Sequence, residues 1–182
     1  MTWLLLPLAH AQTASQAFTP APLAGREVFE LRVGVAADQA HAQLCGEAHA
    51  LAWLSIEACG TGAGVLHQDP GAELAHFRTR ASRQLHAAGR LQVDGAVGAG
   101  FAELQVGEDA PGFLFGEART SDQTSGAGPE ASAGLKARFW MTEKSFLVGD
   151  LTGGAAHVPA APTVSGDGPL LPFGAFTIGL GF

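Results

Sequence analysis

Residues 130–141 read EASAGLKARFWM, and the apolar side chains in this stretch recur at every second position. One face carries Ala131, Ala133, Leu135, Ala137, Phe139 and Met141, and the other carries Glu130, Ser132, Gly134, Lys136, Arg138 and Trp140. A period of two is typical of a β-strand, because successive side chains of a strand point to opposite faces. The stretch therefore predicts a strand with one apolar and one charged face.

The same alternation returns in three other parts of the chain. It runs through residues 29–36, 75–82 and 91–94, each time with charged side chains or histidine gathered on one face. About ten such residues cross a bilayer when the strand is tilted. The pattern predicts an all-β protein, either a membrane barrel or a half-buried soluble sheet.

Composition narrows the class of protein. The 182 residues fit one domain, 47% of them are hydrophobic and only 15% are charged. No segment approaches the roughly 18 to 20 consecutive apolar residues of a membrane-spanning helix, so a membrane protein with this sequence would cross as strands. The net charge of −7, without a basic stripe, argues against a nucleic-acid partner.

The N-terminal residues predict export. Residues 1–11 hold a short apolar run that ends in Ala9-His10-Ala11, a small-residue pattern typical of signal-peptide cleavage. No Lys or Arg precedes the run, and the run is short, so we expect this signal to be truncated at its start. Residues 12–25 then form a flexible lead-in, and residues 26–182 form the barrel domain.

The turn signals divide this domain into strands. We place strands at 27–37, 51–62, 73–85, 90–106, 113–119, 130–141, 145–157 and 173–182, which makes eight. Counting 41–49 as a strand and dividing 90–106 would give ten. The connection at 142–145 is tight, whereas Thr120–Pro129 and His157–Pro172 form long loops. Short turns on one side and long loops on the other are typical of outer-membrane barrels.

The last ten residues carry the most specific signal. Phe176, Ile178, Leu180 and Phe182 occupy every second place, with small or polar residues between them. Here the chain resembles the small, eight-stranded outer-membrane β-barrel proteins of Gram-negative bacteria, whose last strand alternates in this way and closes on an aromatic residue. The resemblance implies a transmembrane antiparallel up-and-down β-barrel in the outer membrane. It also implies that these four residues form the signal recognised by the barrel-assembly machinery.

An eight-stranded barrel is wide enough only for side chains, so we expect its lumen to be filled rather than open as in a porin. The inward-facing charges would be Glu30, Arg32, Arg78, Arg80, Asp94, Lys136 and Arg138, joined by His76, Glu117, Arg119 and Asp150. Buried charges must pair, which predicts a structural salt-bridge network. In a soluble sandwich the same side chains would face water, and periodicity alone does not separate the two.

Two cysteines, Cys45 and Cys59, are compatible with a disulfide in an exported protein. They lie symmetrically about Ala52, so a hairpin that turns at residues 50–53 would set them opposite each other. In the eight-strand register, however, residues 37–50 are a loop, from which Cys45 could still reach the next strand. Two unpaired thiols are the third alternative.

The chain has no Tyr, although membrane barrels usually carry Tyr and Trp at both interfaces. Trp53 and Trp140 lie beside predicted turns, where such an anchor belongs, but either side chain could pack inside. The eleven Phe residues would have to supply the rest of the aromatic contacts with the interface.

No motif predicts catalysis, a metal site or a cofactor. His76 and Ser82 lie ~20 Å apart along a predicted strand, too far for proton transfer, and the His spacing fits no metal-ligand set. We therefore predict a non-enzymatic barrel that contacts outer-membrane lipid and has a structural or adhesive role through its long loops. The alternative is a soluble periplasmic β-barrel or sandwich that binds a small apolar ligand. A lipid-modifying barrel enzyme comes third.

Overall fold

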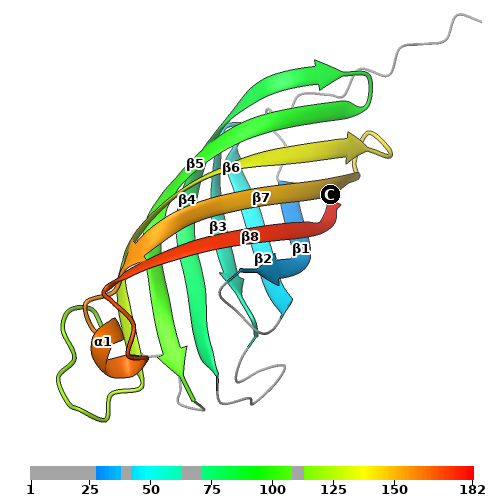
Figure 1. Ribbon diagram of the computed structural model, residues 1–182. Coiled ribbons are helices and arrows are strands. Elements are labelled where there is room, and N and C mark those ends of the chain that lie inside the picture. The colour runs from blue at the N-terminus through cyan, green and yellow to red at the C-terminus, as the bar shows by residue number, and fades with distance from the viewer. Residues whose placement is uncertain (1–27, 38–41, 63–70, 108–112) are drawn as a thin grey trace, which may run out of the picture.

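The structure, a computed structural model, describes residues 28–37, 42–62, 71–107 and 113–182. In these residues eight antiparallel strands close into one barrel, since the first strand pairs with the last (Figure 1). The strands are β1 (Val28–Ala36), β2 (Ala42–Leu51), β3 (Leu54–Gly60), β4 (Ala72–Ala88), β5 (Leu91–Val106), β6 (Ser125–Trp140), β7 (Phe146–His157) and β8 (Leu170–Gly181). One short helix, α1 (Ala161–Val164), joins β7 to β8. The predicted eight-stranded antiparallel barrel is confirmed for the described residues. The ten-strand count is wrong because 91–106 is one strand, although the strand that this alternative placed at 41–49 corresponds to β2.

Two segments differ from the expected strands. Residues 42–51 form β2, although they lie mostly within the loop expected at 37–50. Residues 113–119, expected to be a strand, make only one isolated bridge, between Phe115 and Ala127. Their backbone leaves the extended region at Phe113 (φ 42°) and at Gly116 (φ 99°), which ends any regular pairing. The expected signal segment and lead-in at residues 1–25 lie outside the described residues.

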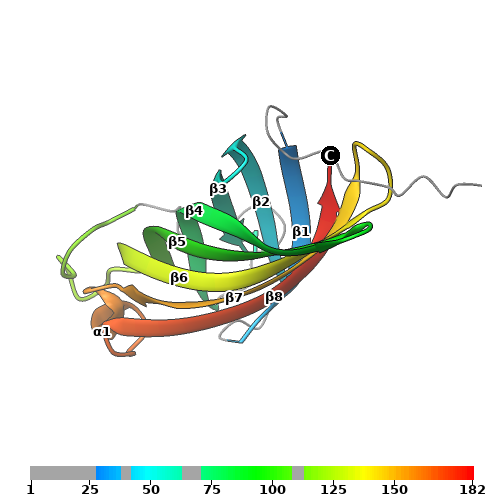
Figure 2. The same ribbon diagram turned by 90° about the horizontal axis from the view of Figure 1, so that it is seen from above.

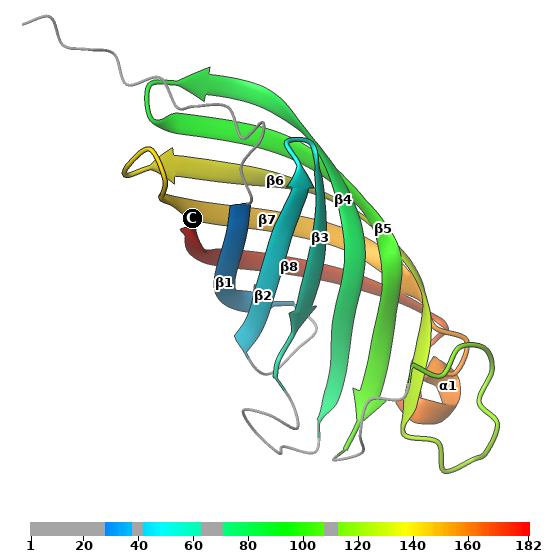
Figure 3. The same ribbon diagram turned by 180° about the vertical axis from the view of Figure 1, so that it is seen from behind.

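The connections between strands sort to the two ends of the barrel. At one end lie the tight turns after β2, β4 and β6, together with the end of β8 (Figures 1 and 3). At the other end lie the longer connections, including residues 113–124 after β5 and residues 158–169, the latter carrying α1. The loop expected at Thr120–Pro129 is shorter on its C-terminal side, because β6 already begins at Ser125. The expected alternation of short turns and long loops is present.

The outer surface of the barrel is apolar. Large apolar side chains that are 39% or more exposed lie on its strands, among them Phe29, Leu31, Val33, Val35, Leu44, Ile56, Val97, Leu135, Phe139, Leu147, Leu151, Phe176, Ile178 and Leu180. Within the described strands, charged residues at outward positions occur only toward the strand ends. Glu73 and Glu103 lie near the long loops, and Arg83 lies in the part of β4 that extends past its pairing with β3. The inside and outside of this sheet are therefore reversed relative to a soluble barrel.

Small residues on the inner wall make room for large side chains. A Cβ added at Gly98 of β5 would lie 2.5 Å from the Ser132 hydroxyl and 3.4 Å from the Arg78 side chain. A Cβ at Gly181 of β8 would lie 2.1 Å from the Phe146 ring. Glycine on one strand thus leaves room for the side chains of the adjoining strands, since Gly181 is the register partner of Phe146. Figure 2 shows the barrel from above.

Two apolar clusters close the ends of the lumen. At the loop end, Leu74, Ala102, Leu104 and Phe173 pack with residues of β7 and with Ala161 of α1. At the turn end, Val28, Trp140, Phe146 and Val148 form a second cluster. Trp140 is 2% exposed, so it packs inside the barrel and is no interfacial anchor, whereas Trp53 is 54% exposed at the β2–β3 turn. In the part of the chain that the structure describes, no helix has the length and apolar character needed to span a membrane.

Candidate functional site: the charged interior

Between the two apolar clusters the lumen is filled by ion pairs. The described residues contribute six carboxylates, Glu30, Glu47, Glu57, Asp94, Glu130 and Asp150, and five cations, Arg32, Arg78, Arg80, Lys136 and Arg138. Each of these residues is 5% exposed or less. They come from every strand except β8, because the inward positions of β8 are mostly small. Charges of opposite sign balance almost completely inside the barrel.

Glu57 of β3 is the centre of this network. Its carboxylate accepts hydrogen bonds from three guanidinium groups, those of Arg32, Arg78 (2.5 Å from Nε to Oε1) and Arg80 (2.7 Å from Nη1 to Oε2). Arg32 and Arg80 also meet at Asp150 of β7, at 3.0 and 2.9 Å. Glu57 and Asp150 therefore each link a cation of β1 to a cation of β4.

Lys136 of β6 connects this centre to the turn end. Its Nζ donates to Glu30 (2.8 Å) and to Glu47 (2.5 Å). Glu30 also accepts from Arg138 (2.8 Å from Nη2 to Oε1), and Arg138 in turn pairs with Asp94. The pairs run without a break from the middle of the lumen to the cluster that contains Trp140 and Phe146, since the Arg138 guanidinium lies over the Phe146 ring at 5.5 Å.

The loop end of the network holds a histidine and a carboxylate. His76 Nδ1 of β4 lies 2.6 Å from Glu130 Oε2 of β6, and its ring lies 4.4 Å from the Phe173 ring, centroid to centroid. Arg78 is 3.8 Å from the other oxygen of Glu130. His76 thus pairs with a carboxylate two strands along the barrel wall, beside Phe173 of the apolar cluster that includes Ala161 of α1.

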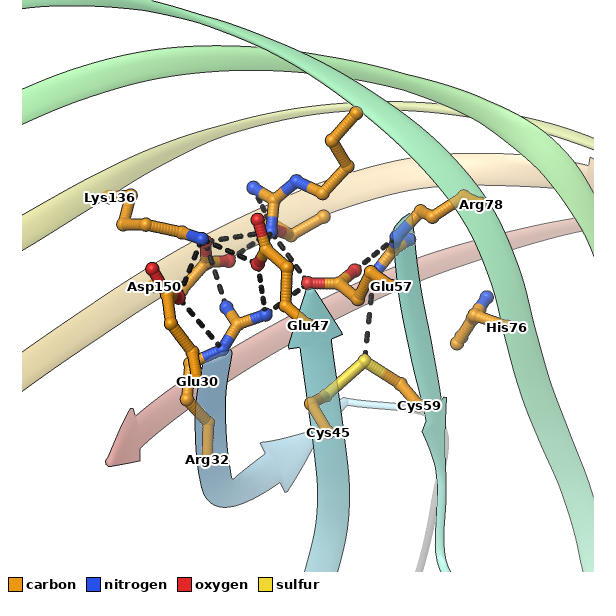
Figure 4. The surroundings of a disulfide bond; sticks show 12 residues. Glu30, Arg32, Cys45, Glu47, Glu57, Cys59, His76, Arg78, Lys136 and Asp150 are labelled. Atoms are coloured by element: carbon orange, nitrogen blue, oxygen red, sulfur yellow. Dashed lines mark hydrogen bonds and ion pairs between the residues drawn. A yellow bond between two sulfur atoms is a disulfide. The ribbon is translucent and has the colours of Figure 1, made fainter. Parts of the chain in front are cut away.

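A disulfide joins Cys45 of β2 to Cys59 of β3 inside the barrel (Figure 4). The two residues are register partners, with their Cα atoms 4.1 Å apart, as in the hairpin alternative of the sequence analysis. The same register sets Glu47 opposite Glu57. Two like charges in one cross-strand pair would destabilise the hairpin. Arg32 of β1 donates to both carboxylates and so compensates them.

One cluster has the composition of a metal site. Glu30, Glu47 and His49 offer ligand atoms that all lie within 4.8 Å of one another. The Lys136 ammonium, however, already bridges the two carboxylates. His49 Nε2 lies 3.1 Å from Glu30, the carboxylate that also accepts from Arg138. The protein's own cations therefore occupy the position that a divalent ion would take.

The two histidines of the interior contact other side chains of the lumen. In the described residues the ring contacts of His76 and His49 are with carboxylates, with Phe173 and with Arg138, and none is with a Ser, Thr or Cys nucleophile. Apolar clusters close both ends of the lumen. In the described part of the barrel, the ion pairs thus lie between these two apolar clusters.

The structure brings the seven charged residues expected in the lumen into one network: Glu30, Arg32, Arg78, Arg80, Asp94, Lys136 and Arg138. Asp150 belongs to it as well. Glu117 and Arg119 do not, because their segment is no strand and both side chains are exposed. The four apolar residues expected to form the assembly signal, Phe176, Ile178, Leu180 and Phe182, lie exposed at the end of the chain, three of them on β8.

Sequence reasoning missed several members of the network. Glu47 and His49 were hidden by the loop expected at 37–50, and Glu57 and Glu130 were not placed in the lumen. One signal could have found two of them. The symmetry about Ala52 that pairs the cysteines also pairs Glu47 with Glu57, two residues closer to the turn of the hairpin.

Neither the protein-family models nor the curated proteins compared with the chain give a match.

Proposed function

We propose that this protein is a small outer-membrane β-barrel of a Gram-negative bacterium that has no catalytic role. Its barrel is a rigid frame in outer-membrane lipid. Its role is structural, or it is adhesive through recognition of a partner by the long loops outside the cell. The barrel-assembly machinery is its partner during insertion. The proposal is supported by the apolar outer surface of the barrel and by its charged interior.

The observation that carries the proposal is the height of the uncharged outer band. Outward positions of β5 from Leu91 to Phe101 are Leu91, Val93, Gly95, Val97, Ala99 and Phe101, all without charge. Ten residues at ~3.3 Å each, on a strand tilted by ~40°, rise about 25 Å along the barrel axis. The lipid-facing band of outer-membrane barrels is about 25 Å tall. The band thus matches the hydrocarbon thickness such barrels cross.

The interior argues against the soluble, ligand-binding alternative. A soluble barrel that binds an apolar ligand needs an apolar pocket inside and polar side chains outside. Here the lumen holds ion pairs, and residues such as Val35, Ile56 and Leu151 are more than half exposed on the outside. In water that surface would be an apolar patch far larger than soluble proteins expose.

The loop end is where recognition would take place. Residues 117–124 and 158–169 connect strands at this end, and exposed Glu117, Arg119, Asp122 and Asp167 lie on them. Loops on a rigid frame can vary in sequence without loss of the fold. Because three of the four described charged residues of these loops are acidic, the partner we expect is a neutral or basic surface.

The test is to fractionate cells that express the full chain and to run the membrane fraction on a gel with and without boiling. We expect the protein in the outer membrane, with faster mobility before boiling, because a closed barrel stays folded in detergent until heated. A known soluble periplasmic protein serves as the control. Recovery of this chain in the periplasmic fraction without a mobility shift would favour the soluble alternative.

A further inference from the structure

A short segment after β5 folds back onto the outside of the barrel. We name residues 113–116 the strap; they read Phe-Leu-Phe-Gly. The Phe113 N–H donates to Glu103 of β5 (3.0 Å to Oε1), and the Ala127 N–H of β6 donates to the Leu114 carbonyl (2.8 Å). β6 pairs with β7 only from Glu130 onward. The strap thus supplies the partner that β7 does not give to Ala127.

The two rings of the strap join two rings of the barrel wall. Phe77 of β4 and Phe101 of β5 are register partners whose rings stack at 5.1 Å. Phe113 packs edge-on against both, at 5.3 and 5.6 Å, and Phe115 packs against Phe101 at 5.5 Å. Phe113 is nevertheless 43% exposed and Phe115 is 54% exposed. The result is one four-ring patch on the outer surface.

The strap is held in place at a local cost. Phe113 has a φ of 42°, which bulky residues rarely adopt and which costs about 1–2 kcal/mol. The hydrogen bond to Glu103 and the contacts with Phe77 and Phe101 offset this cost. The strap also covers the Glu103 carboxylate, which is at an outward position of β5 and yet only 3% exposed. It thereby removes a charge from the outer surface.

The four-ring patch lies at the edge of the uncharged outer band of the barrel. Phe101 is at the loop-side edge of the uncharged outer band, so the four rings continue that band without a gap. Aromatic side chains gather at the edges of membrane-spanning bands, and this chain has no Tyr to place there. Phe has no polar atom for a headgroup, so its place is on the acyl-chain side of the interface.

We propose that the strap is embedded in the membrane, where Phe113 and Phe115 contact lipid acyl chains and form the loop-side aromatic anchor with Phe77 and Phe101. This inference rests on the proposed function, because a soluble barrel has no lipid around it. It adds that a connecting segment, and not only the strands, forms part of the lipid-facing surface.

The test places one tryptophan on the strap. In the full chain, Trp3, Trp53 and Trp140 are replaced by Phe, and either Phe115→Trp or Leu135→Trp is then introduced. Leu135 is 52% exposed on the outer face of β6 and is the matched control within the band. Each variant is reconstituted in phosphatidylcholine vesicles whose acyl chains are plain or brominated, and emission is measured with and without iodide in the water. Phe113→Trp is a second reporter in case Phe115→Trp does not insert.

We expect brominated chains to quench both reporters and iodide to quench neither. If iodide quenches the strap reporter and brominated chains do not, while Leu135→Trp is quenched by the lipid, the strap lies in water and this inference is overturned alone. If brominated chains leave Leu135→Trp itself unquenched, the membrane barrel is overturned and the strap proposal with it.

Discussion

At the scale of single residues, the carboxylate of Glu57 is the one on which the interior most depends. It neutralises Arg32, Arg78 and Arg80, all buried. Glu57→Gln keeps the shape but removes the charge, which leaves three guanidinium groups with one counter-charge fewer. Breaking a buried ion pair on one side costs about 3–5 kcal/mol. We expect a loss of that order in the free energy of unfolding, measured by denaturant titration in lipid vesicles.

Two further variants separate charge from packing at this site. Glu117→Gln is the control, because Glu117 is exposed and its loss should change the free energy of unfolding by no more than about 0.5 kcal/mol. In the double variant, Arg78→Met removes a cation that the missing carboxylate would have balanced, so we expect a smaller total loss than the sum of the two single variants. A Glu57→Gln protein as stable as the parent would contradict the network.

At the scale of elements, the disulfide makes a prediction about the β2–β3 hairpin. Cys45 and Cys59 are 14 residues apart in sequence and close a loop within one hairpin. Crosslinks over loops of this length stabilise by about 3 kcal/mol. We expect the double variant Cys45→Ser with Cys59→Ser to lose ~2–4 kcal/mol on unfolding while it keeps the heat-dependent gel shift, because backbone pairing flanks the crosslink on both sides.

The parent protein supplies the control for this prediction. Reduction of the parent should lower its free energy of unfolding as much as the two serines do, and should leave the serine variant unchanged. Thiol titration of unfolded, unreduced parent protein should find no free cysteine. Two titratable thiols under those conditions would show that the crosslink does not form.

A second element, the segment around α1, depends on a glycine of β6. A Cβ at Gly126 would lie 2.7 Å from the Ala160 Cβ and 3.4 Å from Val158. Gly126→Val should therefore push residues 158–164 out of the barrel mouth, and a protease added to vesicles should cleave this segment faster. Gly149→Val on β7 is the matched control, because nothing lies within 4 Å of its Cβ position. Equal cleavage rates in both variants would rule out this packing.

The elements also show where sequence reasoning reaches its limit. β6 was predictable because apolar outward residues alternate with charged inward ones, and β8 because large apolar residues mark its outward face. The eight-strand register missed β2, since its outward positions include Gly46 and Ala48 and its inward positions include Cys45, so that apolar and charged residues do not alternate clearly. The strap was mistaken for a strand because its aromatic residues alternate, although they reach the outer surface from a loop. Local periodicity does not report such packing between distant segments.

At the scale of the whole molecule, the proposed membrane location predicts that the effect of a charge on the apolar outer surface depends on its depth in the bilayer. Leu135, 52% exposed, lies midway along the outer face of β6, whereas Phe139, 46% exposed, lies near the turn end of the same strand. Arg on the lipid face of a barrel costs about 2–4 kcal/mol at the bilayer midplane and about 0–1 kcal/mol near the interface. The same substitution at these two positions should therefore have different effects.

We expect Leu135→Arg to lower the free energy of unfolding in lipid vesicles by ~2–4 kcal/mol and Phe139→Arg by no more than ~1 kcal/mol. Both positions are on one strand and on one face and receive the same charge, so the main difference between the two variants is depth. In a protein whose outer face met water, both guanidinium groups would be hydrated and neither variant would lose much stability. Equal, small losses at the two positions would therefore place the outer face in water, whereas the expected difference would place residue 135 in the hydrocarbon core.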